Sequence, residues 1–214
     1  MRAWSVLLVL PSVLLIGCEK PSRRHLDLDL VRITGEGKLR TDVVGDAVQE
    51  TATFVLVDAE NTAKEGAYVT LAGDLADASG TPVGAFKAQS LWIPAGERRT
   101  FALVDRERKP RPTAARATIR VRSATIPDQP PPARVDQLRE LPDNGDLVVQ
   151  GILHNDAARR GEIMVIASFH GSDGRPMTRP FSLVMVPAGA ARAVQFVSPP
   201  GAAHGTIYVG DVSY

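Results

Sequence analysis

The segment Leu91-Trp92-Ile93-Pro94-Ala95-Gly96 runs from an apolar strand pattern into a turn, and it returns as Val184-Met185-Val186-Pro187-Ala188-Gly189. Proline lacks the donor that a sheet ladder needs and glycine accepts a positive φ, so each segment predicts a strand ending at a tight turn. Other residues and short segments around this pair also recur in the same order, at offsets of 88 to 95 residues. They are Asn61 and Asn155, Ser79-Gly80-Thr81-Pro82 and Asp173-Gly174-Arg175-Pro176, Phe101 and Phe196, and Thr118-Ile119-Arg120-Val121 and Thr206-Ile207-Tyr208-Val209. The repeat predicts two copies of one domain.

Each copy has the pattern of short strands separated by turns. Segments in which apolar residues alternate with polar ones or follow one another predict strands at His25–Leu30, Thr51–Val57, Tyr68–Leu71, Leu91–Ile93, Phe101–Val104 and Thr118–Arg122. Gly80 and Gly174 are expected to supply the positive φ of hairpin turns, and the two Asn residues to hydrogen-bond their own turns. The connections are too short for crossover helices, so the sheets should be antiparallel. The predicted fold is all-β, with two tandem antiparallel sandwiches of the immunoglobulin-like type.

The stretch Pro127-Asp128-Gln129-Pro130-Pro131-Pro132-Ala133 separates the two copies. Consecutive prolines favour polyproline II and act as a semi-rigid spacer. We therefore expect a first domain over 25–127, a linker over 128–134 and a second domain over 135–214. The two domains are expected to be separate folding units.

The chain begins with a basic Met1-Arg2 and an apolar run to Leu15, which is too short to span a membrane and has the layout of a secretory signal. Leu15-Ile16-Gly17-Cys18 resembles the lipobox of bacterial lipoproteins. This resemblance implies cleavage of a signal peptide over 1–17, recognition of Leu15, Ile16 and Gly17 by the signal peptidase, and a lipidated Cys18. Residues 18–24 would then form a tether to the membrane. Glu19 follows the cysteine where some inner-membrane lipoproteins carry Asp, which favours the outer membrane over the inner one.

Composition excludes few functions but disfavours some. A formal net charge of +1 argues against general nucleic-acid binding, and with a single cysteine the domains must hold by packing without disulfides. The four histidines lie at 25, 154, 170 and 204, without the close ligand spacing of zinc sites. Calcium could bind at Asp27 with Asp29, or at the Asp143–Asp146 turn. Acidic residues in this pattern are also common in ordinary turns. We expect no metal, no cofactor and no catalytic residue.

Seven basic residues gather in one segment of the first copy: Arg106, Arg108, Lys109, Arg111, Arg116, Arg120 and Arg122. Two interpretations are open. The segment could contact phosphates of lipid head groups, or it could be a solvated loop whose charges protect a strand edge from aggregation. The second interpretation is favoured.

The two copies resemble the immunoglobulin- or fibronectin-like sandwiches of bacterial envelope proteins, most closely the FxLyD type. The second copy carries that pattern as Asn155, Phe169 to Gly174, Val186 to Gly189, and Phe196. It departs from the type at Phe169-His170-Gly171, and the first copy departs more, at Asp74-Leu75-Ala76-Asp77. The resemblance implies a sandwich fold and a binding role, with no activity.

Alternation along the paired apolar strands indicates a partner surface. It directs Leu91 and Ile93 inward and Trp92 outward, and in the second copy it turns Leu183 and Met185 outward. Tryptophan is enriched at binding hot spots, so Trp92 is expected on an exposed patch used for a partner or for docking the two domains. The alternative, which is slightly favoured, is that a neighbouring loop covers Trp92. The expected function is a lipid-anchored, non-enzymatic envelope protein that binds another envelope protein. The alternatives are an enzyme with a site at the domain junction and a purely structural spacer.

Overall fold

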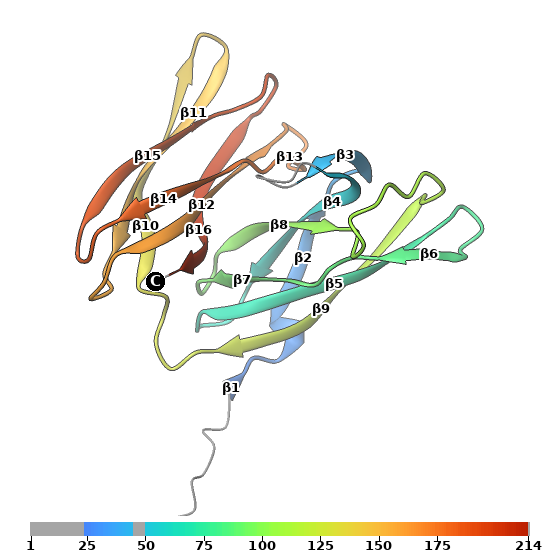
Figure 1. Cartoon of the computed structure of the whole chain (residues 1–214), viewed down its shortest axis with the longest axis horizontal. Helices are drawn as coiled ribbons and strands as arrows, with labels where there is room; N and C mark the ends of the chain where they lie inside the picture. The colour runs from blue at the N-terminus through green and yellow to red at the C-terminus, as the bar shows by residue number, and fades with distance from the viewer. Residues whose placement is uncertain (1–23, 45–49, 214) are drawn as a thin grey trace, which may run out of the picture.

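The computed structural model describes residues 24–44 and 50–213. They form an all-β protein of two antiparallel sandwiches, one from each copy of the repeat, so the predicted fold class is confirmed (Figure 1). The strands of the first sandwich are β1 (Arg24–His25), β2 (Val31–Glu36), β3 (Arg40–Val44), β4 (Glu50–Asn61), β5 (Ala67–Ala76), β6 (Pro82–Ala85), β7 (Gln89–Ile93), β8 (Arg98–Val104) and β9 (Arg116–Ile126). Those of the second are β10 (Ala133–Asp143), β11 (Asp146–Asn155), β12 (Gly161–His170), β13 (Pro176–Thr178), β14 (Phe181–Val186), β15 (Ala191–Val197) and β16 (His204–Ser213).

The two sandwiches share one pairing scheme. In the first, β4 pairs with β8 on one edge and with β2 and β3 on the other, while β5 pairs with β9, β6 and β7. In the second, β11 lies between β10 and β15, and β12 pairs with β16, β13 and β14. Strands that occupy the same place in the two sandwiches contain the segments that repeat in the sequence.

The buried Asn61 and Asn155 close equivalent turns with equivalent hydrogen bonds, to which Asn155 adds one to Pro187. Asn61 donates from Nδ2 to the carbonyls of Glu65 (2.8 Å) and Ile93 (3.1 Å) and accepts from the Ala63 N–H (3.0 Å). Asn155 donates to the carbonyls of Arg159 (2.9 Å), Val186 (3.0 Å) and Pro187 (3.2 Å) and accepts from Ala157 N–H (3.1 Å). Each amide thus ties the end of a long strand to the apolar strand that ends in Pro-Ala-Gly. The glycines predicted at the hairpins, Gly80 and Gly174, have φ of 90° and 74°.

One strand prediction is wrong. The alternating segment at 25–30 forms strand only at Arg24–His25, and Leu28–Leu30 forms a 3₁₀ turn. Asp27 caps that turn by accepting from Asp29 N–H at 3.1 Å. Short polar side chains bond nearby backbone groups in this way and compete with strand pairing.

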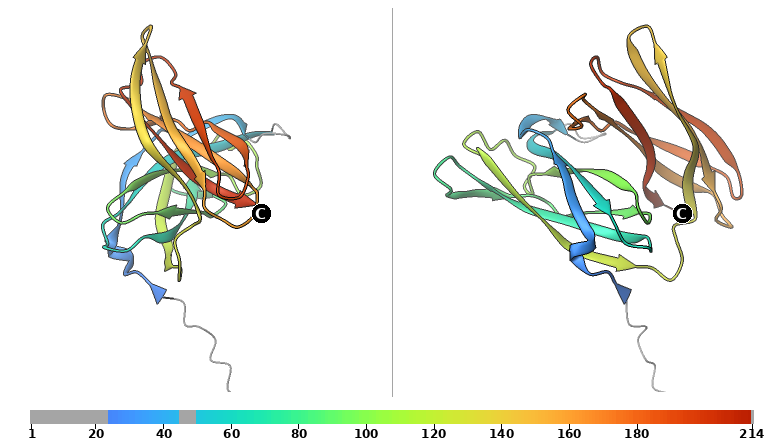
Figure 2. Two further views of the ribbon diagram at one scale, coloured as in Figure 1. Left: turned by 90° about the vertical axis from the view of Figure 1, so that its left-hand side faces the viewer. Right: turned by 180° about the vertical axis from the view of Figure 1, so that it is seen from behind.

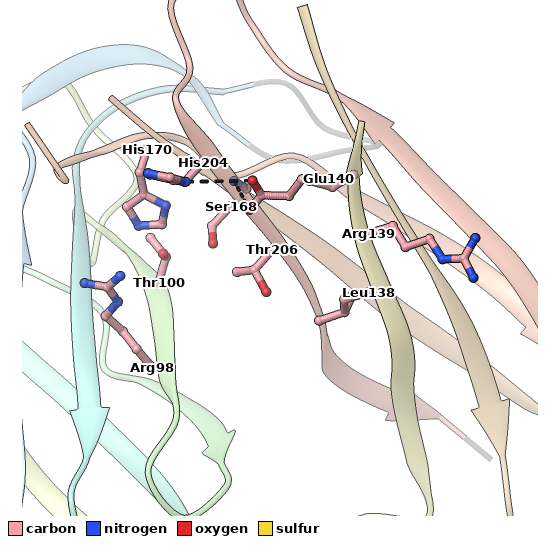
Figure 3. A pocket seen from close by; sticks show the side chains of 11 residues that line it. Arg98, Thr100, Leu138, Arg139, Glu140, Ser168, His170, His204 and Thr206 are labelled. Atoms are coloured by element: carbon pink, nitrogen blue, oxygen red, sulfur yellow. Dashed lines mark hydrogen bonds and ion pairs between the residues drawn. The ribbon is translucent and has the colours of Figure 1, made fainter. Parts of the chain in front are cut away.

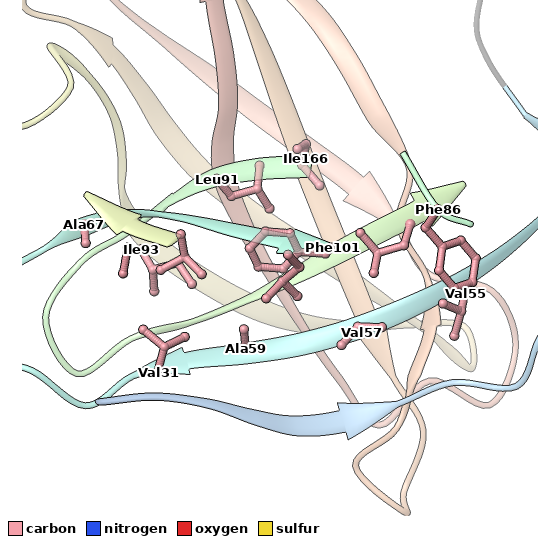
Figure 4. Packing of buried hydrophobic residues seen from close by; sticks show 14 of the residues in the cluster. Val31, Val55, Val57, Ala59, Ala67, Phe86, Leu91, Ile93, Phe101 and Ile166 are labelled. Atoms are coloured by element: carbon pink, nitrogen blue, oxygen red, sulfur yellow. The ribbon is translucent and has the colours of Figure 1, made fainter. Parts of the chain in front are cut away.

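Two apolar clusters fill the sandwiches, and the first receives residues from both. Val55, Val57 and Phe101 lie in the first cluster together with Ile166 and Tyr208 of the second sandwich (Figure 4). The second cluster lies between the β11 and β12 sheets and contains Leu153, Ile163, Val165, Ala167, Phe169 and Ile207. Apolar packing therefore continues from one sandwich into the other.

The proline-rich segment connects the sandwiches without strand structure. β9 ends at Ile126 and β10 begins at Ala133, so the strand-free stretch is 127–132. Asp128, Gln129 and Pro130 are exposed. β1 lies on the side of the first sandwich remote from β11 and β15 (Figure 2). Within the described ranges, no helix has the length and apolarity to cross a membrane.

Candidate functional site: the cleft between the sandwiches

The outer face of the β4 sheet meets the outer face of the β12 sheet. On β4, Val57 and Ala59 point into the first core, so alternation turns Asp58 to the outer face. On β12, Ala167 and Phe169 point into the second core, so His170 faces the first sandwich. His170 Nε2 lies 2.9 Å from Asp58 Oδ2, and both side chains are buried. This polar contact therefore joins the sandwiches at a place where each sheet is covered by its own core on one face and by the other sandwich on the opposite face.

Further hydrogen bonds surround this contact. Thr100 on β8 donates from its hydroxyl to Asp58 Oδ1 at 2.6 Å, and its carbonyl accepts from Tyr208 Oη at 2.6 Å and from Arg179 Nε at 2.7 Å. The guanidinium of Arg99 lies over the Tyr208 ring, with 4.9 Å from Cζ to the ring centroid. Six side chains and one carbonyl thus fix the relative position of the two sandwiches.

A cleft of about 400 Å³ opens beside this network. Its lining comes from four strands of the second sandwich and one of the first: Leu138, Arg139 and Glu140 on β10, Val149 on β11, Ser168 and His170 on β12, His204, Gly205 and Thr206 on β16, and Arg98 and Thr100 on β8. In Figure 3 most of these side chains face a common space, while Arg139 points away from the others. The cleft therefore exists only because the sandwiches are packed together.

Two hydroxyls line the inner part of the cleft. Ser168 and Thr206 are cross-strand partners on β12 and β16, and so lie side by side on one face of the sheet. Ser168 is fully buried, and its Oγ has no hydrogen-bond partner among the described residues. A buried hydroxyl without a partner is unfavourable, so this atom is a candidate ligand contact.

The rim of the cleft is charged. Glu140 accepts from Gly205 N–H at 3.2 Å, and its other oxygen lies 3.7 Å from His204 Nδ1. On the opposite wall, Arg98 is exposed, and no carboxylate pairs with it in the described part of the chain. A bulge in β10, where Gln137 has a φ of 51°, shifts the register next to Leu138 and shapes this wall.

The cleft does not contain the hydrogen bond that links a serine nucleophile to a histidine base among the described residues. A serine nucleophile needs a hydrogen bond to its base. Here His170 Nε2 is engaged by Asp58, and Ser168 Oγ forms no bond to the ring or to any other described group. Among residues 24–44 and 50–213, no cluster of three or more His, Cys, Asp or Glu has the geometry of a metal site.

The residues predicted as a partner surface are placed at two separate strands, β7 and β14. Leu183 and Met185 are 46% and 45% exposed, and with Phe181 they form an apolar row on β14. Trp92 is half-buried, packs beside Tyr68 with ring centroids 5.4 Å apart, and covers Gly66. The partner surface stays a prediction. The lipobox residues Leu15, Ile16, Gly17 and Cys18 lie outside the described residues.

The basic segment is largely neutralised within the chain. Arg111 pairs with Asp105 (2.8 Å) and Glu107 (3.0 Å), and Lys109 also pairs with Glu107 (3.3 Å). The other ion pairs of the segment are Arg108 with Glu50 and Arg120 with Asp74. Burial opposes ionisation of Asp105, but the Arg111 guanidinium and the N–H groups of Lys109 and Glu107 outweigh it and hold the pKa of Asp105 below its usual value. These pairs favour the interpretation of an ordered loop over that of a phosphate-binding surface.

Sequence patterns did not identify the cleft residues. The sequence places Thr206 in a repeated strand segment and His170 in the Phe169 to Gly174 pattern, but neither pattern indicates a binding site, and Ser168 and Arg98 belong to no motif. The usable signal was the run Ile163-Met164-Val165-Ile166-Ala167, which is apolar at consecutive positions and so indicates a strand buried on both faces.

Comparison with known proteins adds little beyond the fold. No protein-family model matches the chain, and no curated protein matches it. Similar solved structures include a β-glucuronidase of glycoside hydrolase family 2, with 11% identity and a TM-score of 0.25 over 79% of this chain. The chain spans 22% of the length of that enzyme. Another is a protein described as secreted, from Parabacteroides distasonis, with 12% identity and a TM-score of 0.24, covering 88% of this chain and 84% of that one. Similarity at this level does not bear on activity or location.

Proposed function

We propose that this protein is a lipid-anchored, non-enzymatic protein of a bacterial cell envelope that binds another envelope protein in the cleft between its sandwiches. The observation that carries the proposal is the cleft itself. In the part of the chain that the structure describes, it combines a buried hydroxyl without a hydrogen-bond partner, an arginine without an ion pair and an apolar wall in a junction held by hydrogen bonds. Convergent polar groups in a pre-formed hollow are typical of binding sites.

The anchoring part of the proposal rests on the lipobox resemblance at Leu15 to Cys18. Acyl chains on Cys18 would attach the protein, and Glu19 favours the outer membrane. Because β1 lies remote from β11 and β15, the second sandwich would face away from the anchor (Figure 2). Metabolic labelling with a fatty acid tests this part. Label in the parent and none in Cys18→Ser is expected, and equal label in both would contradict it.

The binding part is tested by filling the cleft. Thr206→Trp would place a large ring beside Ser168, while Thr118→Trp changes the repeat-equivalent and exposed position on β9. After cross-linking in intact cells, a partner captured by the parent and by Thr118→Trp should be lost from Thr206→Trp. A structural spacer would give no specific partner with any of the three proteins. An enzyme acting at the junction would instead turn over envelope material without forming a stable complex.

A further inference from the structure

We propose that the junction cleft recognises the carboxylate of an acidic side chain carried by an extended segment of the partner polypeptide. The inference rests on the proposed function and names what the cleft binds. Three features support it: an uncompensated cation, a pair of hydroxyls and a sheet edge.

The cation is Arg98. It lines the cleft from β8, where its partner in the strand register is Glu60 of β4, and no carboxylate forms an ion pair with it within the described ranges. The single carboxylate in the lining, Glu140, is already engaged by Gly205 N–H and His204. Guanidinium binds carboxylate through two parallel hydrogen bonds. Arg139 also belongs to the lining but points away in Figure 3, so Arg98 is the arginine offered to a ligand, and with Glu140 close by a singly charged group fits the cleft better than a doubly charged phosphate.

The hydroxyls of Ser168 and Thr206 supply the next contacts. They project from paired strands on the face that lines the cleft, and Ser168 Oγ is a fully buried donor with no acceptor among residues 24–44 and 50–213. A carboxylate is an acceptor-only group that can receive several hydrogen bonds. Placed between Arg98 and the two hydroxyls, it would satisfy the buried Ser168 donor.

The sheet edge indicates that an extended chain carries this carboxylate. β16 pairs only with β12 among the described strands, and Gly205 turns its N–H away from β12 toward Glu140. A Cβ at Gly205 would lie 2.6 Å from Val149 and 2.8 Å from Phe169, so the backbone packs closely here. In the first sandwich, the equivalent strand β9 accepts β1 on its edge, where Arg24 and His25 pair with Ile126 and Thr125, at the end of β9 remote from Thr118, the equivalent of Thr206. This fold therefore already adds a short extended segment at such an edge, a recurring mode of peptide binding.

Two synthetic hexapeptide mixtures test the inference, one with a fixed central Glu and one with Gln at the same place, both randomised elsewhere. Binding is followed by NMR through the amide shifts of Gly205 and Thr206 in the full mature chain. The Glu mixture should bind roughly tenfold more tightly than the Gln mixture, as expected for a charge-assisted pair. Arg98→Gln should remove that preference, and Arg122→Gln, at an exposed arginine on β9, should keep it. Ser168→Ala should weaken the Glu mixture without lowering the melting temperature.

Equal affinity for the two mixtures, no binding of either at millimolar concentration, or a preference that survives Arg98→Gln would overturn the inference. Free glutamate that binds as tightly as the Glu mixture would overturn the polypeptide part. Failure here is distinguishable from failure of the proposed function. If Thr206→Trp still loses its envelope partner, binding in the cleft stands and the recognition chemistry differs. If cells yield no partner although the Glu mixture binds, the envelope-protein partner is the part that fails.

Discussion

His170 Nε2 lies 2.9 Å from Asp58 Oδ2, and this contact joins two strands from different sandwiches. The two residues are 112 positions apart in the chain, and each is buried on the outer face of its own sheet. Asp58 also accepts from Thr100, so both oxygens of its carboxyl are satisfied. Because His170 also lines the cleft, the contact that stabilises the junction also holds one wall of the cleft in place.

Replacing the histidine should destabilise the whole protein. His170→Ala leaves Asp58 buried with one partner fewer, and a buried polar group that loses its partner costs about 1–3 kcal/mol. The free energy of unfolding, measured by urea denaturation, should fall by about 2 kcal/mol. His25→Ala, at an exposed position on β1, should change it by less than about 0.5 kcal/mol. Equal effects of the two substitutions would show that the junction contact contributes nothing.

The two buried asparagines should be equally sensitive to truncation. Asn61→Ala and Asn155→Ala each leave several backbone groups without the hydrogen bonds that the amide now makes. Each should therefore lower the free energy of unfolding by about 2–4 kcal/mol. Gln129→Ala, in the exposed linker, serves as the control. Thermal unfolding of the three variants checks the prediction. A large loss for one asparagine and none for the other would contradict the structural equivalence of the copies.

Local patterns were enough to predict these asparagine turns and the hairpins. Asn, Gly and Pro determine the backbone conformation of the residues next to them. A repeated segment such as Pro-Ala-Gly therefore predicts the same turn in both copies. The strand expected at 25–30 failed for a local reason too, because Asp27 capping competes with the alternating pattern. Leu28 and Leu30 consequently remain exposed instead of lining a sheet face.

The junction could not be predicted in the same way. Asp58 and His170 stand at outward positions of strands whose inward residues follow the expected pattern, and outward polar residues normally face solvent. Only the packing of one sandwich against the other buries them. The cleft residues come from five strands, so no spacing along the chain brings them together.

Acid should weaken the loop that Asp105 anchors. The pKa of Asp105 is lower in the folded chain than in the unfolded chain, so its contribution is fully present above the unfolded value of about 3.9. That contribution is lost as the pH falls through the folded-state value. The difference in unfolding free energy between the parent and Asp105→Asn should therefore be large near neutral pH and shrink below about pH 4. A difference that stays constant over this range would contradict the assignment.

The predicted apolar surface can be separated into its two parts. Leu183→Glu should cost less than about 0.5 kcal/mol, because Leu183 is nearly half exposed. Trp92→Glu removes packing against Tyr68 and Gly66, and should cost about 1–3 kcal/mol. Urea denaturation gives both values. If Leu183→Glu also abolishes capture of the partner while remaining folded, β14 belongs to the binding surface.

Photo-cross-linking in intact cells tests the central claim most directly. Leu138 and Leu141 are both exposed on β10, but Leu138 lines the cleft and Leu141 does not. A photoreactive phenylalanine analogue placed at position 138 should capture one envelope protein in high yield, and the same group at position 141 should capture little of it. Capture that is equal at the two positions, or absent at both, would contradict binding in the cleft between the sandwiches.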